Sequence, residues 1–183
     1  MRSDTSNARF LVLLFLGVGC VLLVLKFTFP IILESSRIEI TDKRIIALLD
    51  SVKAKGNVHE SIHLYVFNPL SMLRAASSRP MIFIQRDSRR IVGIHIDTRV
   101  ISSFSDEAFR GALAHELGHL VLGHDLGPVD RPDDQKLREE IEADAFAVKI
   151  VGKNELIAAL KGVGVNDEEI GGRLKRACEA RDG

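Results

Sequence analysis

The chain has 183 residues, which suits one compact domain once a membrane segment is set aside. Its 25 lysine and arginine residues balance 25 aspartate and glutamate residues. This balance indicates neither a basic surface for nucleic acid nor an acidic disordered tail. The two cysteines lie in an apolar segment (Cys20) and near the carboxyl end (Cys178), which argues against a disulfide and excludes a cysteine-based zinc site.

The apolar segment from Phe10 to Phe29 contains one charged residue, Lys26, near its end. At about 1.5 Å per residue, a helix of this length spans the ~30 Å hydrocarbon core of a bilayer. A cleaved signal peptide would have a shorter apolar core and a small-residue cleavage site. The residues before Cys20 match a lipoprotein signal poorly. We therefore expect a short tail over 1–9, a single uncleaved transmembrane anchor over 10–29 and a linker over 30–40.

The flanking charges do not settle which side of the membrane holds the domain. Arg2 and Arg9 precede the span, and Arg37, Lys43 and Arg44 follow it. A short amino-terminal tail with two arginines more often stays in the cytoplasm. On that ground we expect a single-pass protein with its domain outside the cytoplasm.

Residues 41–183 show the periodicities of one α+β domain. An amphipathic helix is expected from Thr41, its N-cap, to Lys55, and Gly56-Asn57 ends it. Alternating apolar residues then predict a strand at 62–66 and two strands at 81–86 and 91–97, the last two joined by a connection of hairpin length. Further helices are expected at 105–123, after a cap by Ser103 or Ser105, and at 135–151, 155–161 and 167–180. The order is a helix, a small antiparallel sheet and then helices.

His115-Glu116-Leu117-Gly118-His119 is an HExxH motif within the helix expected at 105–123. Residues i and i+4 share one helix face, so both imidazoles can reach one metal ion. Two neutral histidines and a third ligand would hold a single zinc ion, with water in the open position. Zinc lowers the pKa of that water to about 7, and Glu116 would accept its proton.

A second HExxH, His59-Glu60-Ser61-Ile62-His63, runs into the strand expected at 62–66. On a strand its two histidines would lie about 13 Å apart along the chain, so we do not expect them to share a metal. The copy at 115–119 sits instead in a helix with apolar flanks, which suits a rigid site.

The third ligand is expected from the helix at 135–151. Glu140 and Asp144 are four residues apart and share a face, whereas Glu142 points nearly the opposite way and Glu139 is displaced. Glu140 as ligand, with Asp144 accepting the other N–H of a ligand histidine, makes a coherent pair. The competing interpretation is a solvated charged face with Lys136 and Arg138.

Two other histidines fit the metal site less well. A metzincin ligand would lie ten residues after His115, where the chain has Asp125. We therefore expect His124, one position short, to interact with the helix carboxyl terminus. We expect His95, in a strand, to be structural.

The segments Ala114–Val121 and Glu140–Ala147, an HExxH followed by ExxxD, resemble the M48 metallopeptidases, the relatives of the HtpX and Ste24 proteases. The resemblance implies a zincin-like helical metallopeptidase domain over 41–183. It also implies His115, His119 and Glu140 as zinc ligands, Glu116 as catalytic base and Asp144 as a supporting residue. An extended substrate would pair with an edge strand beside the cleft, for which Ile91–Ile96 is the candidate.

The expected function is a membrane-anchored, zinc-dependent endopeptidase of protein quality control, acting on membrane or misfolded proteins. An ImmA/IrrE-type regulatory protease is one alternative, although those proteins usually carry Asn at the position of Asp144 and commonly lack an anchor. A membrane-tethered binding module that keeps zinc for stability is another. Glu116 argues against that module, because a structural site needs no base. The expected partners are a protein or peptide substrate and the membrane, without nucleic acid, and the sequence leaves the oligomeric state open.

Overall fold

The computed structural model describes residues 38–67, 80–87, 90–124, 126 and 131–182. The predicted tail, the predicted anchor and most of the predicted linker lie outside these residues. Among the helices that are described, none combines the length and apolar character needed to cross a bilayer.

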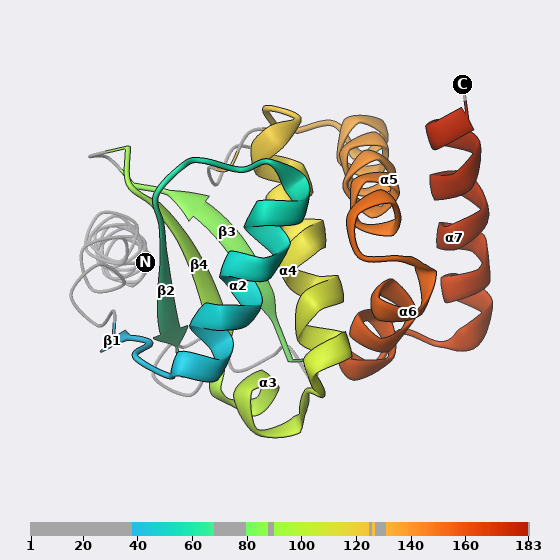
Figure 1. Cartoon of the computed structure of the whole chain (residues 1–183). Helices are drawn as coiled ribbons and strands as arrows, with labels where there is room; N and C mark the ends of the chain where they lie inside the picture. Colours follow the sequence, from blue (N-terminus) through green and yellow to red (C-terminus); the bar gives the residue numbers. More distant parts are fainter. Residues whose placement is uncertain (1–37, 68–79, 88–89, 125, 127–130, 183) are drawn as a thin grey trace, which may run out of the picture. The chain divides into compact units, whose positions relative to one another are not determined.

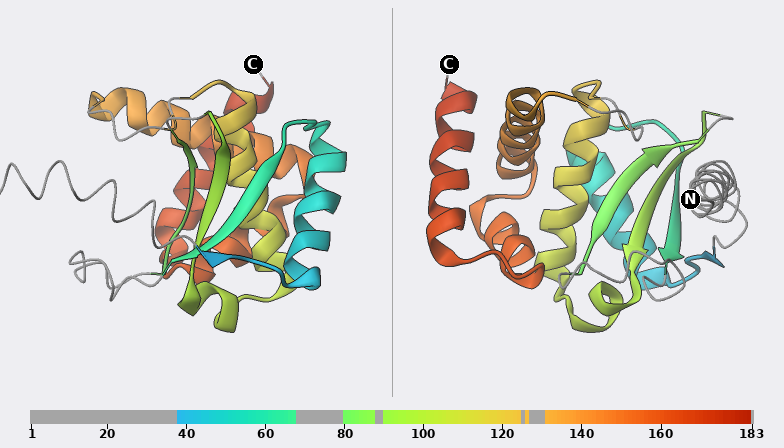
Figure 2. Two further views of the ribbon diagram at one scale, coloured as in Figure 1. Left: turned by 90° about the vertical axis from the view of Figure 1, so that its left-hand side faces the viewer. Right: turned by 180° about the vertical axis from the view of Figure 1, so that it is seen from behind.

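The described part of the chain is an α+β structure, as expected. Its four strands and six helices stack in layers from the sheet to α7 (Figures 1 and 2). The helices α2 and α4 cover one face of the sheet, α5 and α6 pack on α4, and α7 packs on α5. The strands are β1 (Ile38–Glu39), β2 (Ile62–Phe67), β3 (Ile82–Arg86) and β4 (Val92–Asp97). The helices are α2 (Lys43–Gly56), α3 (Thr98–Ser103), α4 (Asp106–Val121), α5 (Asp133–Ile150), α6 (Lys153–Gly162) and α7 (Asp167–Asp182).

The sheet is mixed rather than antiparallel, which corrects the prediction. Its order is β1-β2-β4-β3, and β2 and β4 run parallel while the two outer pairs are antiparallel. The expected hairpin of β3 and β4 forms. The stretch from residue 68 to residue 81 is too long for a hairpin connection, so β3 is not held beside β2 and lies outside β4.

Strand β4 is central, so the expectation that Ile91–Ile96 forms an edge for substrate pairing was wrong. All six of its residues are buried, and both of its backbone edges pair with neighbouring strands. The edge strand beside α4 is β3. Both strands are apolar and short, and the sequence alone did not distinguish the central one from the outer one.

Capping side chains explain where the helices begin. Ser105 accepts a hydrogen bond from the N–H of Ala108 and caps α4, as predicted. Asp42 rather than Thr41 caps α2, and Asn57 ends it in the left-handed conformation. The short helix α3, capped by Asp97, was not predicted.

Helix α4 lies in the interior, with buried residues around its whole circumference. Two glycines allow its neighbours to approach. A Cβ at Gly111 would lie 2.0 Å from the carbonyl oxygen of Glu155 in α6, and one at Gly118 would lie 2.9 Å from Cα of Ala143 in α5. The close packing at Gly118 brings α5 against the HExxH turn.

Candidate active site

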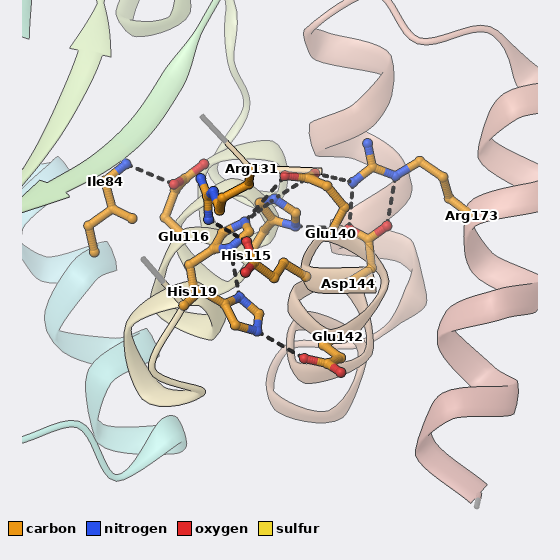
Figure 3. Close-up of polar contacts among 11 residues, drawn as sticks. Ile84, His115, Glu116, His119, Arg131, Glu140, Glu142, Asp144 and Arg173 are labelled. Atoms are coloured by element: carbon orange, nitrogen blue, oxygen red, sulfur yellow. Dashed lines mark hydrogen bonds and ion pairs between the residues drawn. The ribbon is translucent and has the colours of Figure 1, made fainter. Parts of the chain in front are cut away.

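The last turns of α4 place two histidines side by side. His115 and His119 are one helical turn apart, and their Nε2 atoms face each other at 3.2 Å (Figure 3). Their side chains are 15% and 14% exposed. The two nitrogens therefore converge on one partly shielded position.

Helix α5 brings Glu140 and Asp144 to the same place, as their i, i+4 spacing predicted. The Glu140 carboxylate lies 3.5 Å from Nε2 of His115 through Oε2, and 3.5 Å from Nε2 of His119 through Oε1. Asp144 is 1% exposed, and its Oδ1 lies 2.9 Å from Nδ1 of His115. The two carboxylates thus contact opposite nitrogens of the His115 ring.

The separations among His115, His119 and Glu140 fit a metal ion. In the described part of the chain they are the one group of histidine, cysteine or acidic residues whose ligand atoms converge in this way, all within 4.8 Å of one another. Bonds of about 2.0–2.1 Å in a tetrahedral zinc site place neighbouring ligand atoms about 3.3–3.4 Å apart. The Nε2 atoms of the two histidines, 3.2 Å apart, agree with that spacing, and each has a different oxygen of the Glu140 carboxylate at 3.5 Å. Imidazole and carboxylate are ligands that zinc accepts.

Glu116 lies next to this group and points toward the edge strand. Its Oε2 accepts a 2.8 Å hydrogen bond from the backbone N–H of Ile84 in β3 (Figure 3). The residue is 9% exposed. Burial raises the pKa of Glu116 from 4.5 to about 7, so this carboxyl group can exchange a proton near neutral pH.

The charges at the site give the two facing histidines very different pKa values. Burial alone would lower the pKa of His115, but hydrogen bonds to Asp144 and Glu140 outweigh it and raise that pKa to about 10. Burial and the nearby charge of His115 lower the pKa of His119 to about 4. In the metal-free protein one proton therefore lies between the two Nε2 atoms, carried by His115.

Arg173 of α7 is a site residue that the sequence did not reveal. Its guanidinium donates to both oxygens of Asp144, at 2.7 and 2.9 Å, and to Oε2 of Glu140 at 3.3 Å. The hydrogen bonds from His115 and Arg173 outweigh burial and hold the pKa of Asp144 below its usual value. No sequence spacing signals this contact, because Arg173 lies 29 residues beyond Asp144 in an ordinary charged helix.

His124 and Glu142 make a contact that the sequence did not predict. His124 does not serve only the helix end, because its Nδ1 lies 2.9 Å from Nδ1 of His119. Glu142 was expected to point nearly away from the site, yet its Oε2 lies 2.9 Å from Nε2 of His124. His124 follows the end of α4, and its ring contacts the Glu142 carboxylate, which lies on another face of α5 than Glu140.

The remaining candidates have local roles. Glu139 is buried and pairs with Arg131, and Gln135 also donates to it. In the first HExxH, Glu60 pairs with Arg86 and His63 with Glu39, so its glutamate and second histidine point to different partners. His95 is buried and stacks on the ring of Phe83, as expected of a structural residue.

Comparison with protein families indicates the class of protein, a peptidase. Residues 93–159 match the Peptidase U49 family, and that span contains all but the first residue of β4, the HExxH turn of α4 and the acidic turn of α5. The matching family is thus a peptidase family other than M48. No curated protein and no solved structure shows significant similarity to the chain.

Proposed function

We propose that the chain is a zinc-dependent endopeptidase in which His115, His119 and Glu140 hold one zinc ion and Glu116 is the general base. The observation that supports this most is the convergence of His115, His119 and Glu140, whose ligand atoms lie within 4.8 Å of one another, beside a buried glutamate. The match to a peptidase family over the same segment agrees with it.

Bound zinc would polarise the scissile carbonyl and lower the pKa of a water molecule to about 7. Glu116 would take the proton of the attacking water and pass it to the leaving amine, a role that suits a carboxyl group whose pKa is near 7. Asp144 would hold the His115 ring so that its Nε2 points at the metal. Arg173 would keep both carboxylates ionised.

Strand β3 is the proposed platform for an extended substrate. Asp97 donates its N–H to the carbonyl of Met81, and Asp87 donates its N–H to that of Ile91. Because hydrogen-bonded pairs alternate along an antiparallel ladder, the N–H and C=O groups of Ile82 and Ile84 face the open edge. A peptide added there would pass beside Glu116, which already contacts the Ile84 N–H.

The setting of the activity is also part of the proposal. The apolar segment 10–29 supports attachment to a membrane by a single pass, and the arginine-bearing tail supports a domain outside the cytoplasm. Membrane-embedded or misfolded proteins would then be the substrates, in protein quality control.

The test is cleavage of an unfolded protein, reduced casein, by the full chain in detergent. Wild-type protein should cleave it, a chelator should stop cleavage, and zinc should restore it. Glu116→Gln should bind zinc but lose at least about 100-fold in rate. Glu107→Gln, in the exposed first turn of the same helix, should behave as wild type.

Two results would decide against the proposal. Undiminished cleavage by Glu116→Gln would exclude Glu116 as base. Stable zinc binding by a wild-type chain that cleaves no unfolded or membrane protein would favour the binding module.

A further inference from the structure

A chain of hydrogen bonds connects His119 to the protein surface. Nδ1 of His119 lies 2.9 Å from Nδ1 of His124, and Nε2 of His124 lies 2.9 Å from Oε2 of Glu142. The His124 side chain is 6% exposed and that of Glu142 is 43% exposed. The chain thus passes through one buried ring and ends at a solvated carboxylate.

Glu142 sets the direction of every hydrogen bond in this chain. A carboxylate only accepts, so Nε2 of His124 must carry a proton. In its neutral form the His124 ring carries only that one N–H, so its Nδ1 is an acceptor. The facing Nδ1 of His119 must then be the donor. Its Nε2 then carries no proton, and this is the atom that faces His115 and Glu140.

The backbone holds His124 in place for this contact. Gly123 follows α4 with φ of 72°, in the left-handed region. Its N–H donates to the carbonyl of Leu120, and the N–H of His124 donates to that of His119. This pair of bonds is a Schellman motif, a turn that commonly ends helices. It ties His124 to the residue whose ring it contacts.

We propose that His124 and Glu142 are positioning residues that fix the tautomer and ring orientation of His119, with Nε2 free for the metal. The role toward a metal rests on the proposed function. Asp144 holds His115 in the same sense, through a buried carboxylate backed by Arg173. His119 instead has the imidazole ring of His124 between itself and its carboxylate.

The tautomers can be measured without metal. Long-range proton–nitrogen NMR correlations on the chelator-treated full chain report which ring nitrogen carries the proton. We expect His119 protonated at Nδ1 and His124 at Nε2, and Glu142→Ala should mix the two forms of His124. Protonation of His124 at Nδ1, or at both nitrogens, would overturn the proposal.

Zinc affinity, measured by competition with a chromogenic chelator, gives an independent readout. His124→Leu should weaken zinc binding about 10–100-fold. His124→Asn should restore most of it, because an amide oxygen can take the place of Nδ1. Glu142→Ala should weaken binding less than His124→Leu, and Glu142→Gln less again, because its amide oxygen still accepts.

His63 and Glu39 form a matched control, since they are a second histidine–glutamate pair, 3.1 Å apart. His63→Leu should leave zinc affinity unchanged. Unchanged affinity in His124→Leu, with normal binding by wild type, would refute the positioning role and leave the proposed function intact. Failure of wild type to bind zinc would refute the proposed function, and the NMR result would still decide the tautomer of His119.

Discussion

Arg173 and Asp144 form a two-pronged ion pair between α7 and α5. Nε of Arg173 donates to Oδ2 at 2.7 Å and Nη2 donates to Oδ1 at 2.9 Å. The Asp144 side chain is 1% exposed and that of Arg173 is 19% exposed. The pair therefore links the carboxylate behind His115 to α7.

Removal of the guanidinium should leave a buried carboxylate short of one partner. Arg173→Leu is expected to lower the free energy of unfolding by less than the roughly 3–5 kcal/mol typical of a broken buried pair, because His115 still contacts Asp144. The unfolding free energy of Arg173→Lys should lie between those of wild type and Arg173→Leu, since lysine keeps the charge but not the forked guanidinium geometry. Urea unfolding at pH 7 measures both.

The pH dependence of that loss has a definite sign. The pKa of Asp144 is lowered in the folded protein, so its contribution is present above the unfolded value of 3.8 and is lost as pH falls below it. The deficit of Arg173→Leu should therefore shrink in acid. A deficit that is constant down to pH 3 would mean that only packing of the arginine stem was lost.

Zinc binding should release a proton. His115 has a pKa of about 10 in the metal-free protein, so at pH 7 its Nε2 is protonated and zinc must displace that proton. We expect at least one proton released per zinc at pH 7–8, measured by calorimetry in buffers of different ionisation enthalpy. Apparent affinity should fall about tenfold per pH unit as pH decreases through this range.

The raised pKa of His115 also predicts how the stability of the metal-free protein depends on pH. Its folded pKa lies above the unfolded value of 6.5, so the stabilising contribution of charged His115 is full below pH 6.5 and declines as pH rises toward 10. His115→Gln should lack this decline. Zinc binding without proton release at pH 7 would show that His115 is neutral before the metal arrives.

Substitution by alanine should change the unfolding free energy in opposite directions at two helical glycines. A Cβ at Gly118 would lie 2.9 Å from Cα of Ala143, which forces α5 away from α4 and separates Glu140 from the histidines. We expect Gly118→Ala to cost about 1–3 kcal/mol in unfolding free energy and to weaken zinc binding. Gly171, in α7, has nothing within 4 Å of such a Cβ, so Gly171→Ala should add about 0.5–1 kcal/mol. Equal effects at both positions would exclude the helix contact as the cause.

A proline in the edge strand tests substrate pairing. Ile82→Pro removes an N–H that faces the open edge rather than β4, so the ladder keeps its bonds. We expect kcat/KM on casein to fall about two- to tenfold, the equivalent of one hydrogen bond. The unfolding free energy should fall by the packing that the partly buried Ile82 side chain loses. Unchanged kcat/KM would place the substrate elsewhere.

The sequence predicted the parts of this protein that depend on local spacing. The i, i+4 relations of His115 to His119 and of Glu140 to Asp144 placed those side chains on shared faces, and the structure brings the two faces together. The caps and the β3–β4 hairpin are local as well, and they were predicted with small errors in their bounds.

What the sequence did not predict depends on contacts between distant segments. The central place of β4 follows from a crossover whose path no motif encodes, and the contacts of Arg173 follow from packing of α7 on α5. His124 and Glu142 were judged from the geometry of a single helix. Their contact joins a turn after α4 to another face of α5, which a pattern within one helix does not represent.

The position of Arg173 has a consequence for when the site is completed during synthesis. His115, Glu116, His119 and Glu140 all precede it, and 29 residues separate it from Asp144. At about 5–20 residues per second, the ribosome adds Arg173 roughly 1.5–6 seconds after Asp144. Until then the nascent chain holds Glu140 and Asp144 without the cation that pairs with both. The contact of Arg173 with Asp144 and Glu140 therefore forms only after the proposed metal ligands and the proposed base have all been synthesised.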